Sequence, residues 1–269
     1  MVSSPECRHP TGTAPRVAMF EKMSATSENP WLVGVDGCRA GWLATFVRAR
    51  DNESAVAVFS RFSDIAAVAY SPAVIAIDMP IGLPARSGFG GRAAENAVRP
   101  LLGARQSSVF SVPSRAAIGA ADYREACRIA QETSDPPRKI SKQLFNIAPK
   151  IREVDAALRT DGALASHTFE VHPEVAFWRL NGERALDLPK KVKSRPYSPG
   201  LALRRQLLET AGLPPALVHG TPPHGAAEDD LIDALACAAI ARRLLRGEAT
   251  PFPDPPPRDD FGLPMAIWA

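Results

Sequence analysis

Residues 31–36, Trp-Leu-Val-Gly-Val-Asp, decide the fold of this chain. They form a short apolar run that ends in a carboxylate and is followed at once by Gly37. An apolar run bounded by a turn signal predicts a buried strand. A carboxylate at the tip of such a strand is costly unless it is paired, hydrated or bound to a metal ion. Asp36 is therefore the first candidate functional residue.

The same pattern recurs at residues 74–78, Val-Ile-Ala-Ile-Asp. The chain between the two runs predicts two strands joined by a short link and then a helix, at residues 42–47, 55–59 and 62–70. Short links are typical of antiparallel strands, whereas a helix crossing between strands places the strand at 74–78 parallel to the first. Under that pairing the carboxyl ends of the two strands lie side by side, so Asp36 and Asp78 become neighbours.

A third group of acids, Asp229, Asp230 and Asp233, lies in the alanine-rich segment 226–246, which predicts a long last helix. Acids in the first turn suit the helix dipole, and this is sufficient to explain Asp229 and Asp230. It fits Asp233 less well, because apolar residues surround it. Asp230 and Asp233 share one helix face. Together with the two strand ends they form an all-oxygen donor set, which favours Mg²⁺ or Mn²⁺.

Residues 80–165 lack a strand pattern and predict a mostly helical insertion, including a helix over 139–158 that is interrupted at Pro149. From Arg86 to Arg152 there are twelve Lys or Arg and five Asp or Glu, a net charge of +7. Two interpretations stand side by side: a solvated helical insertion, or a phosphate-contacting surface beside the acids. On the second, the candidate substrate contacts are Arg39, Arg105, Ser107 and Arg115.

A fifth strand is predicted at residues 168–171, followed by a Pro that cannot continue a central strand. Three residues near its end, Glu170, His172 and Glu174, are additional candidate site residues. A carboxylate there faces either the acid group or solvent, depending on the pleat. A His before Pro is equally well explained as a hydrogen-bonded turn residue.

The chain has 269 residues, of which 45% are hydrophobic and 23% charged, as in an ordinary globular protein. We expect one domain over residues 30–269 after a disordered leader, residues 1–29. Residues 190–195 predict a flexible basic loop, and residues 261–268 a segment that packs back on the body. The four separated Cys predict neither a zinc site nor disulfides. The absence of a long apolar run or signal-peptide pattern predicts no membrane span and a cytoplasmic location.

The order strand-Asp, strand, strand, helix, strand-Asp, strand, helix-with-Asp resembles the ribonuclease H-like fold shared by Holliday-junction resolvases. More closely, the chain from about Trp31 to Trp268 resembles an uncharacterised family of predicted ribonuclease H-like nucleases. The segments that carry this resemblance are residues 35–42, 77–83, 107–110, 170–174 and 229–234. The resemblance implies an α/β fold with a mixed five-stranded sheet (antiparallel meander, then parallel strands), and nuclease activity. The chain departs from the resolvase pattern at Asp78, where resolvases have Glu.

The leading hypothesis is a metal-dependent nuclease whose catalytic residues and ligands for Mg²⁺ or Mn²⁺ are Asp36, Asp78, Asp230 and Asp233. Two alternatives remain open: a non-catalytic module that binds nucleic acid or a protein, and an enzyme acting on a small phosphorylated ligand or nucleotide. An enclosed pocket would favour the small ligand, and an exposed basic trough would favour a polymer. A homodimer is expected if the substrate is a four-way junction.

Overall fold

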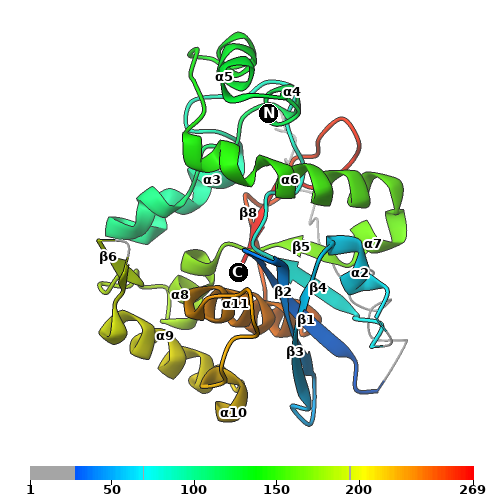
Figure 1. The fold of residues 1–269 in the computed structure, drawn as a ribbon, viewed down its shortest axis with the longest axis vertical. Coiled ribbons are helices and arrows are strands. Elements are labelled where there is room, and N and C mark those ends of the chain that lie inside the picture. Colours follow the sequence, from blue (N-terminus) through cyan, green and yellow to red (C-terminus); the bar gives the residue numbers. More distant parts are fainter. Residues whose placement is uncertain (1–27, 69, 194) are drawn as a thin grey trace, which may run out of the picture.

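The computed structural model describes residues 28–68, 70–193 and 195–269. Most of the predicted leader therefore lies outside the described residues. The centre is a five-stranded sheet in the order β3-β2-β1-β4-β5 (Figure 1). Its strands are β1 (Trp31–Cys38), β2 (Gly41–Arg48), β3 (Ser54–Phe59), β4 (Val74–Ile77) and β5 (Thr168–Glu170). β1, β2 and β3 pair antiparallel, and β1, β4 and β5 pair parallel. This arrangement confirms the predicted mixed sheet.

Both faces of the central strand β1 are buried, which explains its continuous apolar sequence. Leu32 packs in a cluster with the alanines of α11 (Glu228–Leu245). Val33 and Val35 point the other way, into a cluster that includes Phe62 of α2 (Phe62–Ala66) and buried residues of α6 (Lys142–Thr160). The sheet is thus a layer between α11 and the pair α2 and α6. The helix predicted over 62–70 is shorter than expected.

Helix α11 lies unusually close to the sheet because its sheet-facing residues are small. The backbone of Ala234 and Ala238 packs directly on Gly34, which has no side chain to separate them. The buried Thr45 hydroxyl lies 3.2 Å from both the Gly34 and the Ala234 carbonyl oxygens, and so links β1, β2 and α11. This close packing fixes the position of the acids at the start of α11 relative to β1.

The insertion between β4 and β5 is helical, as predicted, and adds no strand to the central sheet. Its elements are α3 (Ala93–Val98), the 3-10 helix η1 (Arg99–Ser108), α4 (Arg115–Ile118), α5 (Tyr123–Glu132), α6 and α7 (Gly162–Ser166). The predicted interruption at Pro149 is wrong, since α6 runs through it. Burying Leu144, Ile151 and Val154 on one face of α6 offsets the cost of about 3 kcal/mol for a proline inside a helix.

The chain after β5 forms α8 (Pro173–Leu180), α9 (Ser198–Thr210), α10 (Pro215–Val218) and α11. Between α8 and α9, the predicted flexible loop contains a small hairpin of β6 (Lys191–Val192) and β7 (Arg195–Pro196). Near the C-terminus β8 (Pro251–Phe252) pairs with β9 (Ile267–Trp268). The Trp268 ring packs edge-on against Phe169 of β5 with ring centres 5.3 Å apart. The last segment therefore packs back on the body, as expected.

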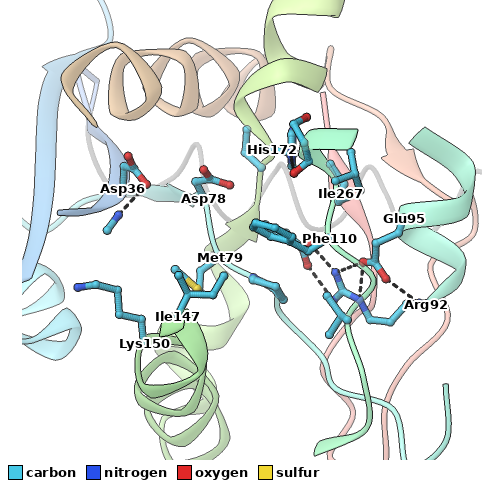
Figure 2. A pocket seen from close by; sticks show the side chains of 17 residues that line it. Asp36, Asp78, Met79, Arg92, Glu95, Phe110, Ile147, Lys150, His172 and Ile267 are labelled. Atoms are coloured by element: carbon cyan, nitrogen blue, oxygen red, sulfur yellow. Dashed lines mark hydrogen bonds and ion pairs between the residues drawn. The ribbon is translucent and has the colours of Figure 1, made fainter. Parts of the chain in front are cut away.

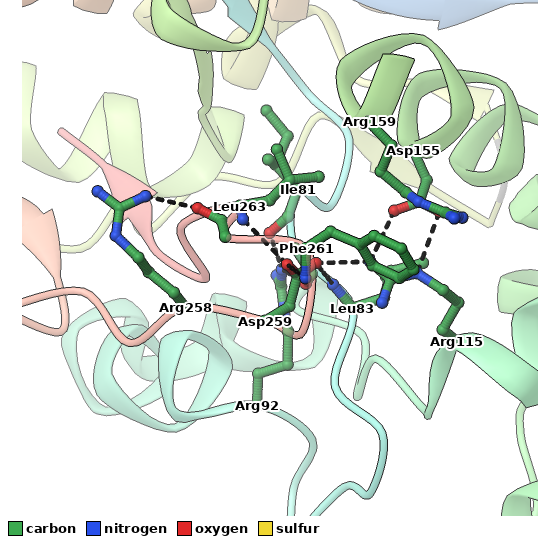
Figure 3. Close-up of polar contacts among 12 residues, drawn as sticks. Ile81, Leu83, Arg92, Arg115, Asp155, Arg159, Arg258, Asp259, Phe261 and Leu263 are labelled. Atoms are coloured by element: carbon green, nitrogen blue, oxygen red, sulfur yellow. Dashed lines mark hydrogen bonds and ion pairs between the residues drawn. The ribbon is translucent and has the colours of Figure 1, made fainter. Parts of the chain in front are cut away.

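The C-terminal segment also ties the insertion to the loop after β4 (Figure 3). One Asp259 carboxylate oxygen accepts from the Leu83 backbone N–H at 3.0 Å and from Arg115 at 2.5 Å. Arg115 pairs in addition with Asp155 of α6 at 2.9 Å. The Phe261 ring lies against Arg115, with the guanidinium 4.6 Å from its centre. These contacts hold Arg115 in a structural cluster.

Among the described helices, none is long and apolar enough to cross a membrane. The predicted cytoplasmic location stays a prediction.

Candidate functional site

Asp36 and Asp78 lie at the carboxyl ends of two adjacent parallel strands. In the register of β1 and β4, Val35 is opposite Ile77, so the next residue of each chain is an aspartate. The Asp78 backbone N–H donates to the Val35 carbonyl at 2.9 Å and continues the pairing past the end of β4. The two carboxylates are therefore neighbours, as the strand pairing predicted.

A cavity of about 220 Å³ opens beside these two carboxylates, between the sheet edge and the insertion (Figure 2). Asp36, Gly37 and Asp78 line one part of it, and Lys150 of α6 lines the same part from the insertion. Asp36 is turned so that one of its oxygens accepts from the Gly37 backbone N–H at 2.7 Å. The cavity thus joins the acid group to the helical insertion.

The start of α11 brings Asp233 into this region. Asp233 is buried, and one of its oxygens forms an ion pair with the Lys190 ammonium. The other oxygen, Oδ1, is also buried and has no hydrogen-bond partner among the described residues. Asp230 accepts from the Ala227 backbone N–H at 2.8 Å and so closes the helix start. Of the two predicted acids on α11, Asp233 is the one with an unused buried oxygen.

The electrostatic environment couples these acids. Burial raises the pKa of Asp36 well above its ordinary value, and the charges of Asp78, Asp233 and Asp230 raise it further. The pKa of Asp78 is raised in the same way, by burial first and then by Asp233. Burial likewise raises the pKa of Asp233, opposed by Lys190. A nearby cation would therefore stabilise the ionised form of all of them.

The donor atoms fit a hard cation in kind, because all are carboxylate oxygens and one of them, Oδ1 of Asp233, is buried without a partner. In the present arrangement these oxygens do not form a complete metal-binding site. Within the described ranges, no three His, Cys, Asp or Glu side chains are placed so that together they hold a metal ion. The Lys190 ammonium instead provides the positive charge next to Asp233.

The candidate Glu170 belongs to a buried ion-pair network. Its carboxylate pairs with the Arg92 guanidinium at 2.6 Å, and the same guanidinium pairs with Glu95 at 2.6 Å. Glu170 also accepts from the Ile81 backbone N–H at 2.7 Å. Burial raises its pKa to about 7 in spite of the arginine. Glu170 and Arg92 line the cavity and hold the loop after β4 in place.

The candidates Glu174 and His172 differ in position. Glu174 accepts two hydrogen bonds from the fully buried Arg204, at 2.7 and 2.9 Å, and is outside the cavity lining. His172 lines the cavity, and its Nε2 lies 3.3 Å from the Ser108 carbonyl oxygen. Because a carbonyl can only accept, Nε2 carries the proton. Burial lowers the pKa of His172, which favours this neutral form.

The predicted substrate contacts do not gather at the cavity. Arg115 is held by Asp155 and Asp259 and does not line this cavity, so its role as a phosphate contact stays a prediction. Arg39 is exposed at the turn between β1 and β2, and Arg105 is half-buried in η1. Ser107 is exposed and lines a second cavity of about 350 Å³ next to the first.

Sequence reasoning missed two cations near the acids, Lys150 and Lys190. The sequence marks Lys150 only as part of the basic insertion, and it predicts a flexible loop at Lys190. Lys190 reaches Asp233 from the residue before β6, and burial opposes the rise in its pKa that Asp233 causes. The available signal for Lys150 is its helical spacing from buried residues of α6, which places it near the buried face of that helix. Nothing in the local sequence marks Lys190.

The fold and the site define an α/β protein with a mixed sheet, a helical insertion and an acidic cavity at the carboxyl ends of its parallel strands. A model of the family described as "Protein of unknown function (DUF429)" matches residues 34–258. The chain belongs to this family. The match starts in β1 and extends beyond α11, so it includes every candidate acid of the site. Searches of curated proteins and of solved structures gave no match.

Proposed function

We propose that this protein is a metal-dependent nuclease that hydrolyses phosphodiester bonds. The observation that carries the proposal is the meeting of Asp36 and Asp78 at one cavity, beside the buried Asp233. Buried carboxylates that raise one another's pKa are typical of sites that use a cation or a proton. The sheet order and the positions of these acids agree with the resemblance to ribonuclease H-like nucleases, and this agreement supports the proposal.

Asp36, Asp78 and Asp233 would hold Mg²⁺ or Mn²⁺, with Asp230 close behind at the start of α11. A bound cation would supply an activated water and a positive charge for the phosphate oxygens. The chain's own contribution is to hold the carboxylates: β1 and β4 fix Asp36 and Asp78, and Lys190 orients Asp233. Nucleic acid as partner, and a dimer for a junction substrate, belong to the same proposal.

The first test is cleavage of labelled duplex DNA, single-stranded DNA, an RNA–DNA hybrid and a four-way junction, in Mn²⁺ and in chelator. Asp78→Asn is compared with the matched Asp64→Asn, whose carboxylate pairs with Arg61 on the surface. Removing a metal-ligating carboxylate is expected to lower the rate by roughly a thousandfold or more. Cleavage that needs Mn²⁺ and is lost only in Asp78→Asn supports the proposal. Absence of cleavage on every substrate counts against it.

A second candidate function is an enzyme that acts on a small phosphorylated ligand or nucleotide. The observation in its favour is the cavity itself, which is small and lined largely by apolar side chains. Such a lining is typical of small-molecule sites. Turnover of mononucleotides or sugar phosphates without cleavage of any polymer would favour this candidate over the nuclease. The non-catalytic binding module is favoured if the acids bind no Mn²⁺ and no substrate is turned over.

A further inference from the structure

The cavity beside Asp36 and Asp78 has two chemically different parts. Apolar side chains form most of its wall, namely Met79, Val109, Phe110, Ile147, Val171 and Ile267. Phosphodiester chemistry at the acids requires only a phosphate and a cation, so this apolar wall needs a separate explanation. Figure 2 shows Phe110 in the middle of the side chains that line the cavity, and Lys150 on the same side of the cavity as Asp36.

Lys150 is suited to contact a phosphate group. Its side chain lies along Gly37, where an added Cβ would come within 2.9 Å of the lysine Cδ. Its ammonium lies 4.5 Å from the centre of the Trp42 ring. Within the described part of the chain, this ammonium has one hydrogen-bond acceptor, the Gly41 carbonyl oxygen at 2.5 Å. A lysine ammonium has three donors, so two remain for an anion next to Asp36.

Phe110 provides the matching apolar feature. It follows the buried Val109 at the end of η1 and is itself only partly buried, so one part of its ring faces the cavity. An aromatic ring that is left partly open in a cavity stacks well on a flat ring of a ligand. The cavity volume, about 220 Å³, is below the range of about 300 Å³ and more for drug-sized ligands. A cavity of this size holds one small ligand at most.

We propose that this cavity binds a single nucleotide unit, with its phosphate on Lys150 beside the acids and its base against Phe110. The inference rests on the proposed function in that it names the part of the substrate that the site holds. A polymer would place one unpaired nucleotide in the cavity. The proposed ligand is therefore a free nucleotide or one unpaired nucleotide of a nucleic acid.

The test is equilibrium binding by calorimetry, with Mg²⁺ and with chelator, which needs no catalysis. The probes are adenosine and cytidine monophosphates, ribose 5-phosphate, which lacks the base, and the nucleosides, which lack the phosphate. Lys150→Met is compared with Lys142→Met, an exposed lysine of the same helix. Phe110→Ala and the aliphatic Phe110→Leu are compared with Phe89→Ala, because Phe89 is 65% exposed and lies outside the cavity lining.

We expect nucleotides to bind at least tenfold more tightly than ribose 5-phosphate, because base–aromatic stacking contributes roughly tenfold or more. Both Phe110 variants should remove this preference. Lys150→Met should weaken the binding of nucleotides and leave the binding of nucleosides unchanged. Equal binding of nucleotides and ribose 5-phosphate would overturn the inference, as would wild-type affinity in both Phe110 variants. Base-dependent binding without any nuclease activity would keep the inference and reject the nuclease. Cleavage without base-dependent binding would do the reverse.

Discussion

Gly34→Ala tests whether the close contact between α11 and β1 positions the acids. A Cβ at Gly34 would lie 2.0 Å from the Ala234 carbonyl oxygen and 2.3 Å from the Ala238 backbone nitrogen. Such contacts are not found below 3.0 Å, so the helix has to move away by at least about 1 Å. Overpacking of this kind costs about 1–3 kcal/mol. The Thr45 hydrogen bond to Ala234 contributes about 1 kcal/mol more.

The expected loss is therefore about 2–4 kcal/mol in the free energy of unfolding, measured by urea denaturation. Because Asp233 is next to Ala234, the same displacement moves it relative to Asp36 and Asp78. A misplacement of about 1 Å lowers a catalysed rate by about a hundredfold, so nuclease activity should fall by that order if the proposed function holds. The control is Gly162→Ala, where an added Cβ meets nothing within 4 Å. A Gly34→Ala protein as stable as the control would refute the packing argument.

Three further predictions concern stability, measured by urea denaturation. Arg204→Met leaves the buried Glu174 without its arginine partner and should lower the free energy of unfolding by about 3–5 kcal/mol. The control Arg205→Met removes a partly exposed ion pair and should lower it by less than about 1 kcal/mol. Similar losses in the two variants would contradict the importance of the buried pair. The pKa of Asp78 in the folded state is raised above the ordinary aspartate value of 3.8. Ionisation of Asp78 therefore destabilises the folded state as the pH rises above about 3.8. Asp78→Asn should therefore gain stability relative to wild type between pH 5 and pH 8; a constant difference would reject this cause. Thr45→Val should lose about 1 kcal/mol, and no loss would show that the hydroxyl is dispensable.

Local sequence patterns were sufficient for the sheet. The apolar run before Asp36 and the run before Asp78 each predict a strand, and the helix between them requires a parallel pairing. The adjacency of the two aspartates follows from that topology without any knowledge of side-chain contacts. The sequence also predicts a role for Asp233, because a charged residue among apolar helix neighbours is costly without a partner.

The remaining site residues depend on contacts between distant segments, which local patterns do not encode. In the sequence, nothing distinguishes Arg115 from the other basic residues of the insertion. In the fold, Asp259, which is far along the chain, binds Arg115 outside the cavity. Pro149 predicts a helix break from its own chemistry, but burial of one face of α6 outweighs that cost. Lys150 lines the cavity only because α6 packs near the carboxyl ends of the parallel strands.

Lys190 shows how the fold tolerates three buried carboxylates in one place. Each of Asp36, Asp78 and Asp233 has a pKa raised by burial, and neighbouring carboxylates raise each of these pKa values further. Lys190 lowers the pKa of all three, and it contacts only Asp233 directly. It therefore offsets part of the repulsion and leaves Asp36 and Asp78 without an ion pair of their own among the described residues. Within residues 28–68, 70–193 and 195–269, the two carboxylates of this group that have no ion pair thus lie at the cavity. A cation or a protonated substrate group would be most strongly stabilised there.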